Sequence, residues 1–294
     1  MKKAQLKSLY KYLIFFAHSI CIAILTCTCA SQAIAAACLV PAGNVIITDT
    51  CDDAYAGNGA AYNNGSITNY GTINSLSQPA VNIEYDDLGF TKYSLYNYGT
   101  ISSSTPNFAV LANDSNVPPI NRRNFNLYNY GSIIQTSTNL YAIYIGETID
   151  GNLTNFTGAT ISSTGGSGSI AISILGHSEN IINFGTISAP NALVLEVVGA
   201  PNRYAIVTNL INGGEITSTT SNGYAVYIHH EVFSGLSAVL GTLTNTGTIT
   251  NSDNSRGIQN EGIITTINNQ QGVGNSAGAL KLTGNLPSNY NVMI

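Results

Sequence analysis

Tryptophan is absent from this 294-residue chain, and charged residues make up only 9% of it. Ten Lys and Arg stand against fifteen Asp and Glu, and four of the ten lie within the first eleven residues. The remainder therefore carries six basic and fifteen acidic side chains, a net charge of 6 − 15 = −9. A surface so poor in basic groups cannot bind a nucleic-acid backbone by releasing counterions, and it holds anionic lipid weakly. We therefore expect no nucleic-acid partner.

The first 35 residues have the pattern of a signal peptide. Lys2 to Lys11 form a basic segment, Leu13 to Ala30 an apolar one, and the run from Ser31 to Ala35 supplies the small residues typical of a signal-peptidase site. We place the cut after Ala35. The alternative is an uncleaved membrane anchor, because Tyr12 to Ala30 is just long enough to span a bilayer.

Cysteine is scarce after the signal, where Cys38 and Cys51 alone remain. In an oxidising compartment such an isolated pair predicts a disulfide, and closing so short a loop would contribute about 3 kcal/mol. We expect residues 36–66 to form an N-terminal cap held by this bond. A metal site is the alternative, but two ligands with no nearby His cannot complete a closed zinc site. We expect no metal and no cofactor.

A short motif recurs along residues 67–268. Its common form is an aliphatic residue, a variable residue, Asn, another variable residue, Gly, Thr or Ser, and Ile. A second block, an Ala followed by alternating apolar residues, lies between the copies, as in Ala142 to Ile145. Periods of 20 to 50 residues indicate a solenoid. The motif asparagines, including those of two looser copies, are Asn69, Asn97, Asn129, Asn155, Asn183, Asn209 and Asn245.

Both blocks are short, rich in β-branched residues and bounded by Gly, Asn or Ser, which is typical of strands and turns. The residue two places before the motif Asn is aliphatic in every copy, from Ile67 to Val207 and Leu243. Stacking the copies in parallel makes these residues one buried column, and the asparagines suit a tight corner where carboxamides bond along the axis. The sequence predicts an all-β, right-handed parallel β-helix of roughly seven to nine coils.

These repeats, the export signal, the Cys pair and the run from Gly257 to Gly272 resemble the passenger of a Gram-negative autotransporter, the type V secretion class. The resemblance covers roughly residues 38–294. It implies a protein of the periplasm, the cell surface or the outer membrane, or a secreted one. Such passengers include adhesins, proteases and esterases, so the family says little about activity.

In that family the passenger continues into a translocator barrel, which this chain lacks before its last residue, Ile294. We expect a passenger without its translocator, a truncated gene product, or half of a split system. Residues 269–294 would then be a truncated C-terminal segment. Its open strand edge would favour end-to-end self-association.

Three residues of the second block are candidates for an acidic rim. If the apolar positions point inward, Glu84, Glu196 and His229 point outward, each four residues after its block Ala. Two carboxylates about 5 to 9 Å apart would suit acid/base hydrolysis of a polysaccharide. The other interpretation is a solvated rim where strands meet loops.

A second candidate is an aromatic column next to the motif asparagines. If it faces water, it is a stripe of rings suited to sugars or partner surfaces. If the corner reverses the alternation, the rings belong to the core, and the sequence does not fix the angle of that corner. The column consists of Tyr70, Tyr98, Tyr130, Phe156 and Phe184, with Tyr96 and Tyr128 two residues before the middle pair.

The sequence therefore favours a non-enzymatic adhesin, or a cell-surface structural or binding protein, with a glycan or a host or neighbouring-cell surface as partner. No catalytic residue is assigned. The alternative is a polysaccharide-acting β-helix hydrolase or lyase that uses the acidic rim.

Overall fold

A computed structural model describes twelve ranges of the chain: residues 37–39, 44–56, 65–75, 79–84, 92–113, 123–146, 149–197, 204–231, 235–252, 257–270, 282–284 and 289–293. The expected signal peptide and most of the expected C-terminal segment lie outside these ranges. Within them, no helix is long and apolar enough to cross a membrane. Residues Ala37–Ile294 form one compact unit.

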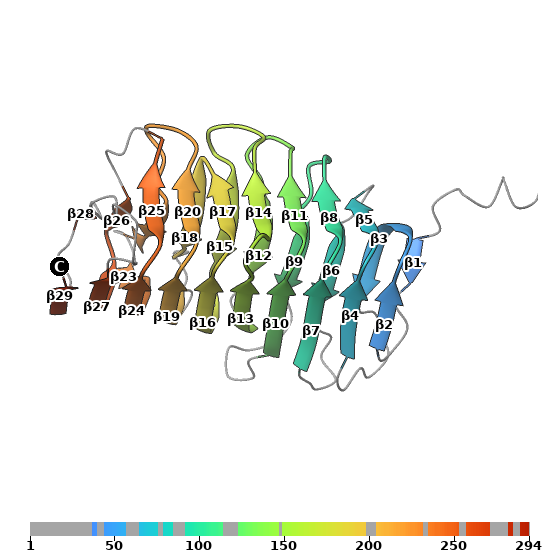
Figure 1. The fold of residues 1–294 in the computed structure, drawn as a ribbon, viewed down its shortest axis with the longest axis horizontal. Helices are drawn as coiled ribbons and strands as arrows, with labels where there is room; N and C mark the ends of the chain where they lie inside the picture. The colour runs from blue at the N-terminus through green and yellow to red at the C-terminus, as the bar shows by residue number, and fades with distance from the viewer. Residues whose placement is uncertain are drawn as a thin grey trace, which may run out of the picture. The chain divides into compact units, whose positions relative to one another are not determined.

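A ten-stranded parallel sheet forms the first face of this unit (Figure 1). Each inner strand pairs with the strand one repeat earlier and the strand one repeat later, as β10 does in register with β7 and β13. Between β13 and β16 the register shifts between Asp150 and Leu153. In order, the strands are β2 (Asn44–Ile47), β4 (Gly65–Asn69), β7 (Lys92–Asn97), β10 (Arg123–Asn129), β13 (Ile149–Asn155), β16 (His177–Asn183), β19 (Ile206–Asn212), β24 (Val239–Asn245), β27 (Ile263–Gln270) and β29 (Asn289–Met293).

The remaining parallel strands form two further faces. On the second face lie β3 (Thr50–Ala56), β5 (Thr72–Ser75), β8 (Thr100–Ser103), β11 (Ser132–Gln135), β14 (Thr160–Ser163), β17 (Thr186–Ala189), β20 (Glu215–Ser218) and β25 (Thr248–Asn251). On the third lie β1 (Ala37–Leu39), β6 (Val81–Glu84), β9 (Val110–Asn113), β12 (Tyr141–Ile145), β15 (Ile170–Ile174), β18 (Asn191–Leu195), β21 (Val226–Ile228), β26 (Ile258–Asn260) and β28 (Leu282–Gly284). Strand β3 pairs with both β5 and β6.

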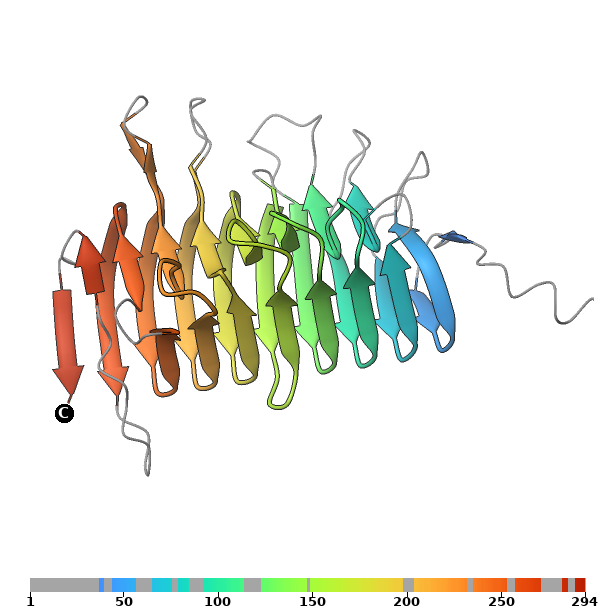
Figure 2. The same ribbon diagram turned by 90° about the horizontal axis from the view of Figure 1, so that it is seen from above.

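One coil consists of three consecutive strands, such as β7, β8 and β9, with one strand on each face. The predicted all-β parallel solenoid is confirmed. The ten strands of the first face differ slightly from the seven to nine coils expected, because β2 and β29 lie outside the recognisable motif copies. An antiparallel hairpin of β22 (His230–Glu231) and β23 (Leu236–Ser237) projects from the stack (Figure 2).

Columns of aliphatic side chains fill the interior. The second face contributes isoleucines from Ile73 to Ile249, and the third contributes Val81, Ile143 and their equivalents, all at most 4% exposed. The inward orientation predicted for the second block is therefore confirmed. On the first face the buried column is Ile67, Leu95, Leu127, Leu153, Ile181, Leu210, Leu243 and Ile267.

One predicted register is wrong. In β19 the residues that align with Leu243 and Asn245 are Leu210 and Asn212, not Val207 and Asn209. The segment contains two asparagines three residues apart, and the stack selects the second, which places Gly214 two residues after it, as in most other copies.

The predicted disulfide lies at the start of the solenoid. Cys51 is buried and aligns with Ile73 of the next coil. Strand β1, which contains Cys38, pairs with β3, which contains Cys51. The side chain of Cys38 lies outside the described part of the chain, so the bond stays a prediction.

Candidate functional site

A buried ladder of asparagines forms the corner between the first and second faces. Each Nδ2 donates to Oδ1 of the next asparagine at 2.8 to 2.9 Å, from Asn69 through Asn97, Asn129, Asn155, Asn183, Asn212 and Asn245 to Asn269. Most of these Nδ2 groups also donate to a backbone carbonyl of the next coil, as Asn97 does to Ser132 at 3.1 Å. The ladder fixes the position of the residue that follows each asparagine.

That residue carries an exposed ring over five successive coils. Tyr70, Tyr98, Tyr130 and Phe184 are 56%, 43%, 39% and 45% exposed, and Phe156 is half-buried. The aromatic column therefore faces solvent, which decides the alternative that the sequence left open. We call these five residues the aromatic edge.

Four rings of the aromatic edge, from Tyr70 to Phe156, stack on one another. Their centroids are 4.9 Å apart for Tyr70 and Tyr98, 4.6 Å for Tyr98 and Tyr130, and 4.0 Å for Tyr130 and Phe156, with interplanar angles of at most 12°. Burial, followed by the neighbouring Tyr98, raises the pKa of Tyr130. Because neighbours cover the ring faces of Tyr98 and Tyr130, these two residues present mainly ring edges and hydroxyls to solvent.

The aromatic edge ends at Phe184. The next position along the column is Gly213, where a Cβ would lie 2.9 Å from Cδ1 of Phe184. The Phe184 ring therefore occupies the space beside that glycine, and no ring continues the column in the following coil.

Tyr96 and Tyr128 form a separate stacked pair on the outer surface of the first face. Their ring centroids are 4.9 Å apart, with an interplanar angle of 12°. The residue aligned with Tyr96 on β4 is Thr68, and the residue aligned with Tyr128 on β13 is Thr154. The pair thus has a threonine at each end of its row.

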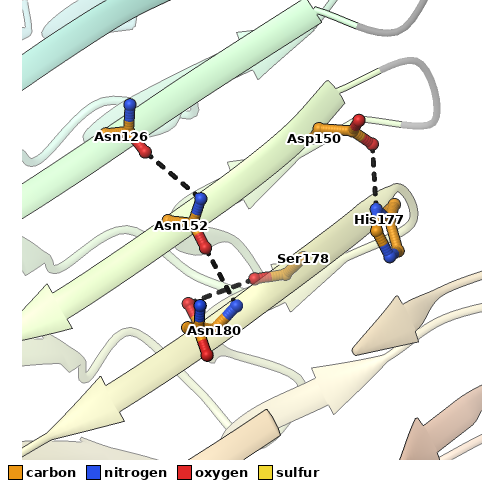
Figure 3. Close-up of polar contacts among 6 residues, drawn as sticks. All are labelled: Asn126, Asp150, Asn152, His177, Ser178 and Asn180. Atoms are coloured by element: carbon orange, nitrogen blue, oxygen red, sulfur yellow. Dashed lines mark hydrogen bonds and ion pairs between the residues drawn. The ribbon is translucent and has the colours of Figure 1, made fainter. Parts of the chain in front are cut away.

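A row of amide side chains runs beside this pair (Figure 3). Asn152 Nδ2 donates to Asn126 Oδ1 at 3.3 Å, and its own Oδ1 accepts from the backbone N–H of Asn180 at 2.9 Å. The row continues to Asn209, whose Nδ2 donates to Asn180 Oδ1 at 3.1 Å. Asn209, predicted to belong to the buried ladder, therefore belongs to this outer row.

One ion pair borders the amide row. Asp150 and His177 lie on neighbouring strands, with 3.0 Å between Oδ1 and Nδ1, and both are partly exposed (Figure 3). The Asp150 carboxylate therefore has a side-chain partner on the neighbouring strand.

The acidic rim consists of residues that directly follow strands of the third face. Leu195, Ile228 and Asn260 align, so the next residues, Glu196, His229 and Glu261, lie on three successive coils. Sequence reasoning missed Glu261 because Gly257 replaces the block Ala in that copy. The side chain of Glu84 lies outside the described part of the chain.

Glu196 is the rim carboxyl group whose pKa is raised. Burial raises its pKa, while a hydrogen bond from Ser173 and the nearby His229 oppose that shift. Glu261 instead accepts a hydrogen bond from the Tyr227 hydroxyl at 2.6 Å. Burial and this bond raise the pKa of Tyr227. The described residues contain no group of three or more His, Cys, Asp or Glu that could hold a metal ion.

Comparison with known protein families, curated proteins and solved structures gave no match.

Proposed function

We propose that this chain is an exported, non-enzymatic binding protein of the autotransporter-passenger type, which adheres to glycan or to a neighbouring cell surface. The signal pattern and the repeat motif support export and the passenger assignment. The solenoid fold is compatible with both.

The observation that carries the proposal is the exposed aromatic edge. The inward columns, the asparagine ladder and the backbone pairing of the strands hold the coils together, and none of them uses the side chains of Tyr70, Tyr98 or Phe184. Exposed aromatic groups gathered on one surface are characteristic of interaction sites, because tyrosine combines a large apolar area with a polar hydroxyl. The low charge of the chain favours neutral partners over strongly charged ones.

The experiment is an adhesion assay with purified protein on bacterial and host cells and on immobilised polysaccharides. The double variant Tyr98→Ser and Tyr130→Ser is expected to lose adhesion. The matched control is Ile263→Ser, which removes a 49%-exposed apolar side chain from β27. Equal adhesion of parent, double variant and control would contradict the proposal.

The acidic rim supports a second candidate function, cleavage of a polysaccharide. A carboxyl group with a raised pKa suits a general acid, and Glu261 lies two coils from Glu196, about 9.6 Å at the usual strand spacing. That separation is close to the upper end of the range for inverting glycosidases. Release of reducing sugar by the parent, lost in both Glu196→Gln and Glu261→Gln, would support this activity.

A further inference from the structure

Saccharides contact aromatic side chains through the ring face. The face of the π-system is negative, and it attracts the weakly positive C–H groups of a sugar ring. A ring whose two faces are covered by other rings cannot make this contact. Tyr98 and Tyr130 are covered in this way within the aromatic edge.

The stacked pair Tyr96 and Tyr128 differs, because each ring stacks against one ring only. The opposite face of Tyr128 looks toward the coil of Thr154, and the opposite face of Tyr96 looks toward the coil of Thr68. A threonine side chain is much smaller than a tyrosine ring, so the surface is lower at Thr68 and at Thr154 than over the pair. We call each of these lower positions a step. The row rises again one coil further, at Ile182 beyond Thr154 and at Ile46 beyond Thr68, so each step is one coil wide and borders one tyrosine face.

The step at Thr154 is lined by groups that suit a sugar. Asn152, Thr154 and Phe156 alternate outward along β13 and the turn that follows it, and all three are half-buried. One Nδ2 hydrogen of Asn152 goes to Asn126, which leaves the second without an acceptor within the described ranges, and the Thr154 hydroxyl has no partner there either. An aromatic face beside a few polar groups is the usual composition of a small-ligand site.

The step at Thr68 repeats this arrangement. Ser66, Thr68 and Tyr70 lie at the aligned positions of β4 and the turn that follows it. The two steps are three coils apart, about 14 Å at the usual spacing of about 4.8 Å between strands. Near Asn152, Asp150 and His177 have 3.0 Å between Oδ1 and Nδ1, and Glu179, next to Asn180 on β16, is an exposed carboxylate.

We propose that the Tyr96–Tyr128 pair is a binding site for a neutral polysaccharide, with one sugar ring stacked on the Thr68 side and another on the Thr154 side. Each sugar chain runs across the solenoid axis, along its own step, because the linkages of a sugar ring extend in the plane of the ring that stacks on the tyrosine. Asn152 and Thr154 donate hydrogen bonds to sugar hydroxyls in one step. In the other step Thr68 donates, and the Ser66 oxygen accepts, because the Ser66 hydroxyl hydrogen is bonded to Asn44 Oδ1 at 2.9 Å. This inference rests on the proposed adhesive function and adds, beside the aromatic edge, a surface for one class of ligand, a neutral polysaccharide.

The test fills the two steps without disturbing the fold. Thr68→Tyr and Thr154→Tyr would extend the existing stack by one ring at each end, because tyrosines already stack in this register on β7 and β10. The control is Thr244→Tyr, the aligned position on β24, away from the pair. Binding is measured by calorimetry against a panel of neutral polysaccharides: a β-glucan, a mannan and a galactan.

We expect each single variant to weaken binding by up to about tenfold and the double variant to weaken it further, with the control unchanged. Unchanged binding in the double variant, with loss in Tyr98→Ser and Tyr130→Ser, would overturn this site and leave the proposed adhesion intact. Adhesion to cells without affinity for any neutral polysaccharide, or with affinity for sulfated ones only, would also overturn the site. Failure of the parent to bind any surface would overturn both proposals.

Discussion

Asn212 and Asn245 lie on successive coils and are joined through their side chains, with 2.8 Å between Nδ2 of Asn212 and Oδ1 of Asn245. The same Nδ2 donates to the carbonyl of Thr248 at 3.0 Å. Both amide hydrogens of Asn212 are thus used inside the protein, where its side chain is fully buried. A buried polar group is stabilising only when its hydrogen bonds are made, so each ladder asparagine depends on its neighbours.

Asn212→Ala should lower the free energy of unfolding by about 1–3 kcal/mol, because Nδ2 of Asn183 loses its acceptor and the Thr248 carbonyl loses a donor. Asn209→Ala is the matched control, since Asn209 lies three residues away in the half-buried outer row. We expect this control to cost about 0.5 kcal/mol or less. Urea unfolding followed by circular dichroism measures both, and equal losses would contradict the assigned register.

The fold could be predicted from the sequence because each coil repeats the same inward columns. Ile67, Leu95 and Leu127 share one position in the motif, and stacking is the only arrangement that buries them all. The choice between Asn209 and Asn212 could not be made locally. Both asparagines follow plausible aliphatic residues, and only the pairing with β16 and β24 separates them.

The site was less predictable than the fold. The sequence identifies the aromatic column, but the exposure of Tyr98 depends on the corner angle, which the buried ladder determines. Stacking also changes what the column presents, because the ring faces of Tyr98 and Tyr130 are covered. That effect depends on the distance between coils, which cannot be read from the residues of a single coil.

The motif glycines allow a close approach between coils. A Cβ on Gly131 would lie 2.0 Å from the carbonyl oxygen of Gly99, a separation far below van der Waals contact. We expect Gly131→Ala to cost about 3 kcal/mol or more, because the backbone of two coils must separate. Gly158→Ala is the comparison: its φ is +83° but no atom lies within 4 Å, so only the left-handed backbone opposes it, at about 1–2 kcal/mol. Thermal unfolding of the two variants would contradict this account if Gly158→Ala were the more damaging change.

Glu196 should make stability depend on pH. Its pKa is raised in the folded state, so the folded state favours the neutral carboxyl group. The stability that the neutral group contributes is fully present below the pKa of the unfolded chain, and it is lost as the pH rises through the pKa of the folded state. Glu196→Gln should therefore be more stable than the parent at neutral pH and should flatten the dependence from about pH 4 upward. Ser173→Ala removes a hydrogen bond that lowers this pKa, so the transition should move to higher pH. Melting temperatures across pH test both, and parallel curves for parent and Glu196→Gln would refute the assignment.

The mature protein is expected to contain a Cys38–Cys51 disulfide. Pairing of β1 with β3 places the two residues on neighbouring strands, and Cys51 is buried in the apolar column. Mass spectrometry of non-reduced peptides from periplasmic material should find the two segments linked. Two free thiols in that material would show the prediction to be wrong.

Adjacent isoleucines on β11 provide the sharpest test of the inward columns. Ile133 is fully buried and aligns with Ile101 and Ile161, whereas Ile134 points outward and is only half-buried. Ile133→Asp places a carboxyl group among aliphatic side chains without a partner, and we expect a loss of more than about 4 kcal/mol. The damage should extend to the coils of β8 and β14, because each coil is stabilised by its neighbours.

Ile134→Asp puts the same group on the same strand but in contact with water, so its cost should stay within about 1 kcal/mol. Denaturant unfolding combined with limited proteolysis measures the extent of both effects, and similar losses in the two variants would mean that the alternation assigned to β11 is incorrect.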